Sequence, residues 1–195
     1  MKTYLFFDTE TSGLHCDCKT NTPFPRMLTF AGVLASEDGE TIETYYDVVK
    51  VRFKIPPFAT KINKITNEYC KERGKPLKEV MLKIKELIER ADVLVAHNYE
   101  FDLDVLKGEF GKINADKDIF TTLETIKYHD TMMESTDFCK LPPHPGYTGY
   151  KFPRLAELHR ILFGCDFEGA HNALSDTLAC KKCFFELKRL GIITD

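Results

Sequence analysis

Two carboxylates near the start of the chain have a spacing that suits a metal site. Asp8 and Glu10 lie in the segment FFDTETSGL, directly after a short apolar and aromatic run. If that run is a strand, its period of two places both side chains on one face. Two acids so close repel each other, and they stay ionised only with a cation or a hydrogen-bond donor between them. The alternative is an acid pair that caps a turn, and these two residues alone do not decide between the two interpretations.

Three more residues that could do chemistry follow later in the chain. Asp102 lies in VAHNYEFDLDVL, and the segment GAHNALSDTLACKK holds His171 and Asp176. Taken singly, a helix-start aspartate is often a partner of the helix dipole, and a His-Asn pair there is often a cap. Five residues of regular helix would turn His171 about 140° away from Asp176. If both face one site, His171 must lie on the loop before the helix.

The hydrophobic pattern predicts the elements that position these residues. Apolar and β-branched runs predict strands at 3–7, 27–35, 41–51, 92–96 and 126–132. Apolar residues at helical spacing predict helices at 76–91, 100–111, 154–163 and about 172–190. Three antiparallel strands followed by alternating helices and strands predict an α/β fold of the ribonuclease H-like type, a five-stranded mixed sheet flanked by helices. We expect a single domain over residues 1–195.

Composition and charge exclude several classes of protein. The chain has 43% apolar and 29% charged residues, as an ordinary folded protein has. It contains no apolar stretch of about 18 residues that could span a membrane, and its start meets acidic residues too soon for a signal peptide. We therefore expect a cytoplasmic protein with no membrane partner. The net charge of −3 argues against tight binding to long duplex nucleic acid, but not against binding to an end.

The seven cysteines follow neither a secreted disulfide framework nor a zinc ribbon. Cys180 and Cys183 lie in a helical pattern, where they are expected to be small core residues. The cluster of His15, Cys16 and Cys18 lacks an evident fourth metal ligand and is expected to be an ordinary loop.

Three segments in register resemble the exonuclease motifs of the DEDDh family, the DnaQ-like 3′-to-5′ exonucleases. They are FDTETSGL, HNYEFDLDVL and HNALSDTL, with weaker matches at KITNEYC, YHDTM and PRLAELHRILFG between them. The resemblance covers nearly the whole chain, from residue 3 to about 187. It implies metal-dependent removal of nucleotides from the 3′ ends of single-stranded DNA or RNA.

The resemblance also implies a role for each of the five residues. Asp8, Glu10, Asp102 and Asp176 would ligate two Mg²⁺ or Mn²⁺ ions, and His171 would be the general base. Carboxylate oxygens suit hard cations that must also hold a phosphate, and an imidazole accepts protons near neutral pH.

Four further residues are expected to hold the terminal nucleotide by the same resemblance: Thr11, Leu14, Asn63 and Asn98. Their alternatives are a turn hydroxyl, a core leucine and turn residues. Many relatives carry a His-Gly pair where this chain has Asn63-Lys64, which puts nucleotide positioning there in doubt. His97 either faces the site or is a satisfied histidine at a strand end. The segment 134–153 is a surface connection or a lid, and the loop 15–26 is longer than the family leads us to expect.

Two other functions compete with the exonuclease. One is a catalytically silent nucleic-acid-binding or interaction module, which should have lost one of the five residues, yet all five are present. The other is hydrolysis of a small phosphodiester. The resemblance allows a polymerase or a second copy of the chain as partner, but the end of the chain soon after the last predicted helix favours a stand-alone enzyme. The sequence does not distinguish DNA from RNA.

Overall fold

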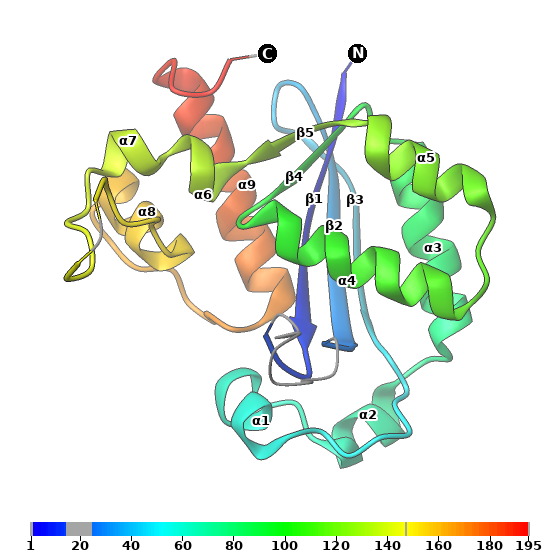
Figure 1. The fold of residues 1–195 in the computed structure, drawn as a ribbon. Helices are drawn as coiled ribbons and strands as arrows, with labels where there is room; N and C mark the ends of the chain where they lie inside the picture. Colours follow the sequence, from blue (N-terminus) through cyan, green and yellow to red (C-terminus); the bar gives the residue numbers. More distant parts are fainter. Residues whose placement is uncertain (1, 15–24, 147, 195) are drawn as a thin grey trace.

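A computed structural model describes residues 2–14, 25–146 and 148–194, and its centre is a five-stranded sheet (Figure 1). The strand order is β3-β2-β1-β4-β5; β1 pairs antiparallel with β2, which pairs antiparallel with β3, while β1, β4 and β5 are parallel. The strands are β1 (Thr3–Thr11), β2 (Met27–Ser36), β3 (Thr41–Val48), β4 (Val93–Ala96) and β5 (Lys127–Asp130). This arrangement confirms the predicted mixed sheet.

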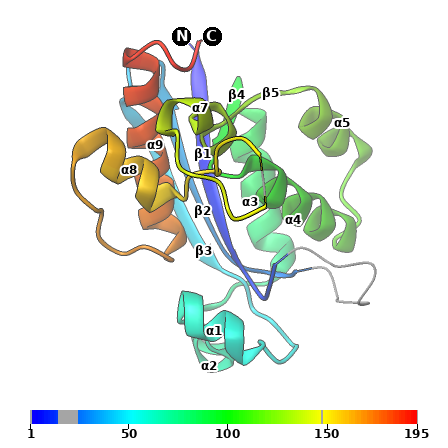
Figure 2. The same cartoon turned by 60° about the vertical axis from the view of Figure 1, so that its left-hand side comes forward.

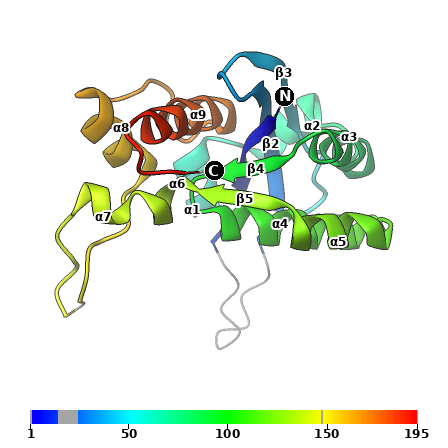
Figure 3. The same cartoon turned by 90° about the horizontal axis from the view of Figure 1, so that it is seen from above.

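Helices cover both faces of the sheet. Seen from above, α8 and α9 lie on one side, and α3, α4 and α5 lie on the other (Figure 3). The short helices α1 and α2 lie below the sheet, at the end where β1 finishes (Figure 2). The helices are α1 (Pro57–Asn63), α2 (Asn67–Arg73), α3 (Leu77–Glu89), α4 (Tyr99–Lys112), α5 (Lys117–Thr125), α6 (Thr131–Glu134), α7 (Thr136–Cys139), α8 (Leu155–Phe163) and α9 (Ala173–Arg189).

The alternation along β1 divides the core in two. Tyr4 and Phe6 are buried against α9, whereas Leu5 and Phe7 are buried against α3 and α4. Because the side-chain period of a strand is two, the face that carries Tyr4 and Phe6 continues into the acidic end of the strand. The cysteines predicted to be core residues, Cys180 and Cys183, are buried in the α9 layer.

The structure differs from the prediction at several boundaries. The first strand continues past residue 7 to Thr11, because its residues keep pairing with β2 as far as Met27. The predicted strand 126–132 ends at Asp130, whose carboxylate accepts hydrogen bonds from the backbone N–H groups of Met132 and Met133 and so starts α6. The third predicted strand, 41–51, ends at Val48. Helices α1, α5, α6 and α7 were not predicted.

Within the described ranges, no helix is both long and apolar enough to cross a membrane.

Candidate active site

Three carboxylates from two elements meet at the end of β1. Asp8 and Glu10 continue the strand face that packs against α9, and Asp176 lies in the first turn of α9. An oxygen of each carboxylate lies within 4.8 Å of the others. Asp8, Glu10 and Asp176 therefore form one acidic cluster, although Asp176 lies far from the other two in the sequence. The hydrophobic packing of β1 against α9 brings them together.

Asp102 lies beside this acidic cluster in the first turn of α4. Its side chain is 3% exposed. One oxygen accepts hydrogen bonds from the backbone N–H of Thr9 at 3.0 Å and from its hydroxyl at 2.6 Å. Thr9 thus holds Asp102 near Asp8, whose pKa is raised first by burial and then by the Asp102 charge. Of the four carboxylates that the sequence singled out, Asp8, Glu10 and Asp176 have oxygens within reach of one ion, and Asp102 lies beside them.

His171 lies outside α9, as its spacing from Asp176 requires. Its backbone has a φ of 68°, in the left-handed region, and its N–H donates to the Asp176 carboxylate at 3.1 Å. Asn172 then caps the helix, because its side chain accepts hydrogen bonds from the N–H groups of Leu174 and Ser175. His171 is exposed and lines a cavity of about 170 Å³ together with Glu10 and Asn63.

The residues expected to hold a nucleotide surround the same strand end, except Asn98. Thr11 donates its hydroxyl hydrogen to the carbonyl of Gly13 at 2.5 Å, and Leu14 is 76% exposed. Asn63 is buried, donates its amide to the Thr11 carbonyl at 3.1 Å and accepts from the N–H of Ile65 at 3.0 Å. Asn98 lies in a left-handed turn at the start of α4.

His97 has a structural role, because both of its ring nitrogens have hydrogen-bond partners. Its ring nitrogens contact the Thr131 hydroxyl and the Pro153 carbonyl, both at 2.9 Å. Burial lowers the pKa of His97 to about 4, so the ring is neutral near pH 7. The interpretation as a satisfied histidine at a strand end is therefore the one that the structure supports. His15, Cys16 and Cys18 lie outside the described residues.

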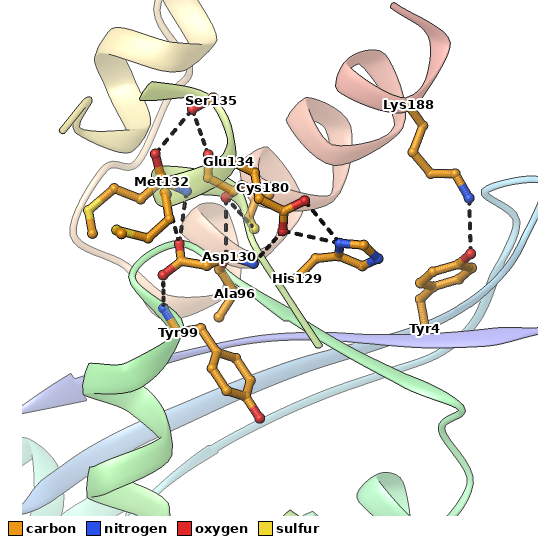
Figure 4. Close-up of polar contacts among 12 residues, drawn as sticks. Tyr4, Ala96, Tyr99, His129, Asp130, Met132, Glu134, Ser135, Cys180 and Lys188 are labelled. Carbon is orange, nitrogen blue, oxygen red and sulfur yellow. Dashed lines mark hydrogen bonds and ion pairs between the residues drawn. The ribbon is translucent and has the colours of Figure 1, made fainter. Parts of the chain in front are cut away.

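Asp130 is a positioning residue to which the sequence analysis gave no role. Its two oxygens accept hydrogen bonds from the backbone N–H groups of Asn98 and Tyr99, each at 3.0 Å. One of them also accepts from the N–H of Met132 at the start of α6, and Figure 4 shows Asp130 between Tyr99 and Met132. One buried carboxylate thus fixes where α4 begins, and with it the place of Asp102. The signal in the sequence was the acid in YHDTM, at the end of a predicted strand.

Burial and mutual repulsion make the acidic cluster unfavourable without a cation. Burial, and then the charges of Asp102, Asp176 and Glu10, raise the pKa of Asp8 well above its ordinary range. Burial followed by the neighbouring carboxylates raises the pKa of Glu10 to about 7. Burial also raises the pKa of Asp102 to about 7 and that of Asp176 to about 6. Such a set of oxygens fits a hard divalent cation, which would neutralise the repulsion.

The metal-free protein is therefore expected to lose stability as the pH rises from about 4 to about 8. Carboxyl groups whose pKa is raised on folding bind more protons in the folded than in the unfolded state, so the free energy of unfolding falls with increasing pH in this window. We expect a loss on the order of 2–4 kcal/mol, after discounting for solvent screening. Urea unfolding with a chelator at several pH values measures it.

Divalent metal supplies the control for this pH dependence. Saturating Mg²⁺ or Mn²⁺ should raise the stability at pH 8 much more than at pH 5, because the ligands must be deprotonated to bind. A free energy of unfolding that rises steadily from pH 5 to pH 8 in the chelator would contradict the electrostatic account.

The chain matches known proteins over almost its entire length. The family model described as RNase_T, exonuclease, matches residues 5–184. The chain is 28% identical over 193 residues to a PolC-type DNA polymerase III of Mycoplasmopsis pulmonis, covering 97% of this chain and 12% of that protein. It is 27% identical over 188 residues to the 3′-5′ exonuclease DinG of Staphylococcus aureus, covering 93% of this chain and 18% of that one. The chain thus spans less than a fifth of these curated relatives.

Solved structures share the fold. Exonuclease I superposes with a TM-score of 0.76 at 21% identity, over 97% of this chain and 41% of the other. Escherichia coli exonuclease I in complex with a dA16 oligonucleotide gives a TM-score of 0.75, with the same identity and coverage. Since the family model covers most of the chain, this protein belongs to the RNase_T exonuclease family, as its resemblance to the DEDDh exonucleases predicted.

Proposed function

We propose that this chain is a metal-dependent 3′-to-5′ exonuclease that releases nucleoside 5′-monophosphates from single-stranded nucleic acid. The observation that carries the proposal is the cluster of Asp8, Glu10 and Asp176, with Asp102 held beside it. Membership of the exonuclease family and the similarity to DinG support the reaction and its polarity. Exonuclease I has been solved with single-stranded dA16 and dT13, which makes single-stranded DNA the first substrate to test.

The four carboxylates would hold two Mg²⁺ or Mn²⁺ ions. All are oxygen ligands, which hard cations prefer, and a neighbouring positive charge would offset the burial and mutual repulsion that raise their pKa values. When bound, such ions would stabilise the negative charge that develops on the phosphate and on the leaving oxygen.

The residues of the chain itself have distinct tasks in this reaction. His171, exposed at the mouth of the cavity next to Glu10, would take a proton from the attacking water on a ring nitrogen. The water oxygen forms a bond to phosphorus as the bond to the 3′-oxygen of the preceding nucleotide breaks, and that oxygen takes a proton from solvent. Thr9 holds Asp102 through two hydrogen bonds, from its N–H and from its hydroxyl, so this carboxylate is oriented before substrate arrives.

Thr11 and Leu14 would bind the terminal nucleotide, Asn63 would position Thr11, and Asn98, at the start of α4, would be a separate substrate contact. The exposed Leu14 offers an apolar surface for a base just beyond Glu10. Asn63 has little capacity left for a substrate, because its amide already contacts Thr11 and Ile65. A DNA polymerase is the partner to test first, since the chain resembles a segment of a PolC-type polymerase; a second copy of the chain is the alternative.

A terminal 3′-phosphate is expected to block the reaction, whereas a 5′-phosphate should have no effect, because the proposed subsite is built for a free 3′ end. Single-stranded DNA and RNA of matched sequence, labelled at the 5′ end, would be incubated with and without Mg²⁺ or Mn²⁺. A descending ladder on the unblocked strand supports the proposal and shows which sugar is preferred. Efficient cutting of a circular single strand would instead show an endonuclease.

A further inference from the structure

We propose that a basic groove outside the catalytic site binds the phosphate backbone of the single strand upstream of its 3′ end. This basic groove has a volume of about 740 Å³, within the range of ligand-binding clefts. The inference rests on the proposed function, since it assigns the groove to the same substrate. Among the residues that line the groove are Arg26, Lys50, Arg52, Phe53 and Lys71.

Three cations in the basic groove are available to bind phosphates. Lys50, Arg52 and Lys71 are exposed, and none forms an ion pair with any carboxylate in the described ranges. Two acids near the basic groove, Asp47 and Glu79, are instead neutralised by Lys75, which lies 2.8 Å from the first and 3.9 Å from the second. The groove therefore has an excess of positive charge on a protein whose net charge is −3. Local cations of this kind attract a polyanion.

Backbone contacts hold the end of α2, with Lys71, against the segment that follows β3, with Lys50 and Arg52. The N–H of Lys50 donates to the Lys75 carbonyl, and the N–H of Lys75 donates to the Val48 carbonyl, both at 2.8 Å. Gly74 permits this approach: a Cβ there would lie 2.2 Å from the Cys70 carbonyl oxygen and 2.6 Å from the Lys50 nitrogen. The end of α2, which carries Lys71, is thus fixed against the segment that carries Lys50 and Arg52.

An aromatic ring and a fixed arginine complete the basic groove. The Arg26 guanidinium lies 5.2 Å from the centre of the Phe53 ring. Glu109, which is 1% exposed, holds Arg26 with two hydrogen bonds, of 2.6 and 3.0 Å. Cations interleaved with an aromatic side chain are typical of surfaces that bind single strands without sequence preference, because phosphates meet the cations and bases stack on the ring.

The position of the basic groove suits a strand whose 3′ end lies at the acids. The carbonyl of Arg26 accepts a hydrogen bond from Ser12 N–H at 2.9 Å, two residues beyond Glu10. The chain that leaves β3 with Lys50 and Arg52 runs past this end of the sheet toward α1 and α2 (Figure 1). The catalytic acids and the basic groove thus lie at the same end of the sheet, which is the placement that one strand bound at both would need.

The groove variant for the test carries three substitutions, Lys50→Gln, Arg52→Gln and Lys71→Gln. The control variant removes equal charge around α4, α5 and β5, with Lys112→Gln, Lys117→Gln and Lys127→Gln. Binding of 5′-labelled oligothymidylate is measured in a chelator at several salt concentrations. For a strand of roughly 20 nucleotides, which exceeds one typical single-strand site, the groove variant should bind about tenfold more weakly. Its slope of log affinity against log salt should shrink by about 2, or ~0.7 for each lost contact. The control should match the wild type.

The outcomes separate this inference from the proposed function. A strand of roughly 3 nucleotides is too short to reach the groove, so the groove variant should release nucleotides from it at the wild-type rate in Mg²⁺. If the wild type releases none from any strand, the proposed function fails while the binding comparison still decides the groove. Equal affinity and salt slope for the groove variant and the control would overturn the inference. The inference would also be overturned if the groove variant bound poly-glutamate more weakly than the wild type but bound the long strand equally well. The groove would then be a protein-docking surface.

Discussion

Asp8→Asn is expected to abolish nucleotide release, with a rate at least about 10³-fold below that of the wild type in saturating Mg²⁺. A catalytic metal contributes several kcal/mol of transition-state stabilisation, and about 4 kcal/mol corresponds to this factor. Asp8 lies at the centre of the acidic cluster, where burial and all three other carboxylates act on its pKa. Removal of the metal by a chelator should have the same effect on the wild type. Release of a labelled nucleotide under single-turnover conditions measures both.

The same substitution should leave the metal-free protein as stable as the wild type or slightly more stable at pH 8, because it removes one of four charges that repel each other. Asp104→Asn is the matched control, since this aspartate lies in the same helix as Asp102 but is exposed. The control should keep full activity. Full activity of Asp8→Asn in Mg²⁺ would end the metal-site assignment, and unfolding of the variant would show that Asp8 has a structural role instead.

His171→Ala is expected to lower kcat by about 10²–10⁴, the usual range for loss of a general base. His171 lies outside α9 and is exposed, and its hydrogen bond to the Asp176 carboxylate comes from the backbone N–H, which the substitution leaves in place. Truncation of the side chain should therefore leave metal affinity nearly unchanged, in contrast to Asp8→Asn. Single-turnover rates, together with titration of Mn²⁺ binding, separate these two effects.

The rates of the wild type and of His171→Ala, measured over a range of pH, test whether His171 acts as the base. The wild-type rate should fall on acidification as Glu10, Asp102 and Asp176 take up protons, so the acid limb alone does not identify a base. The rates of wild type and variant are therefore compared at each pH. His144→Ala is the matched control, an exposed histidine in the irregular segment after α7. If His171→Ala keeps most of its kcat, or loses metal affinity as severely as Asp8→Asn, then His171 is not the base.

Two strand boundaries differ from the prediction because tertiary contacts with no local signal in the sequence set them. Asp130 lies in a pattern that continues as a strand, but its carboxylate binds the N–H groups that start both α4 and α6. A hydrogen-bond partner 31 or 32 positions earlier in the chain is invisible to periodicity, so the predicted strand ran two residues too far. Similarly, β1 extends to Thr11 only because β2 continues to pair with it. Local propensity gives way to such pairing.

The hydrophobic pattern of the sequence was enough to predict the mixed α/β sheet and its longer helices, because these elements carry their own periodicity. Alternation along β1 places Asp8 and Glu10 on one face, and helical geometry places His171 before the helix that carries Asp176, whereas the catalytic roles expected of these residues rest on the resemblance to the DEDDh exonucleases. The contacts that fix Asp102 on Thr9, hold Asn63 at the end of β1 and gather Lys50, Arg52 and Lys71 along one groove are visible in the tertiary structure alone. These contacts depend on the distance between elements, which packing sets and which no spacing along the chain encodes.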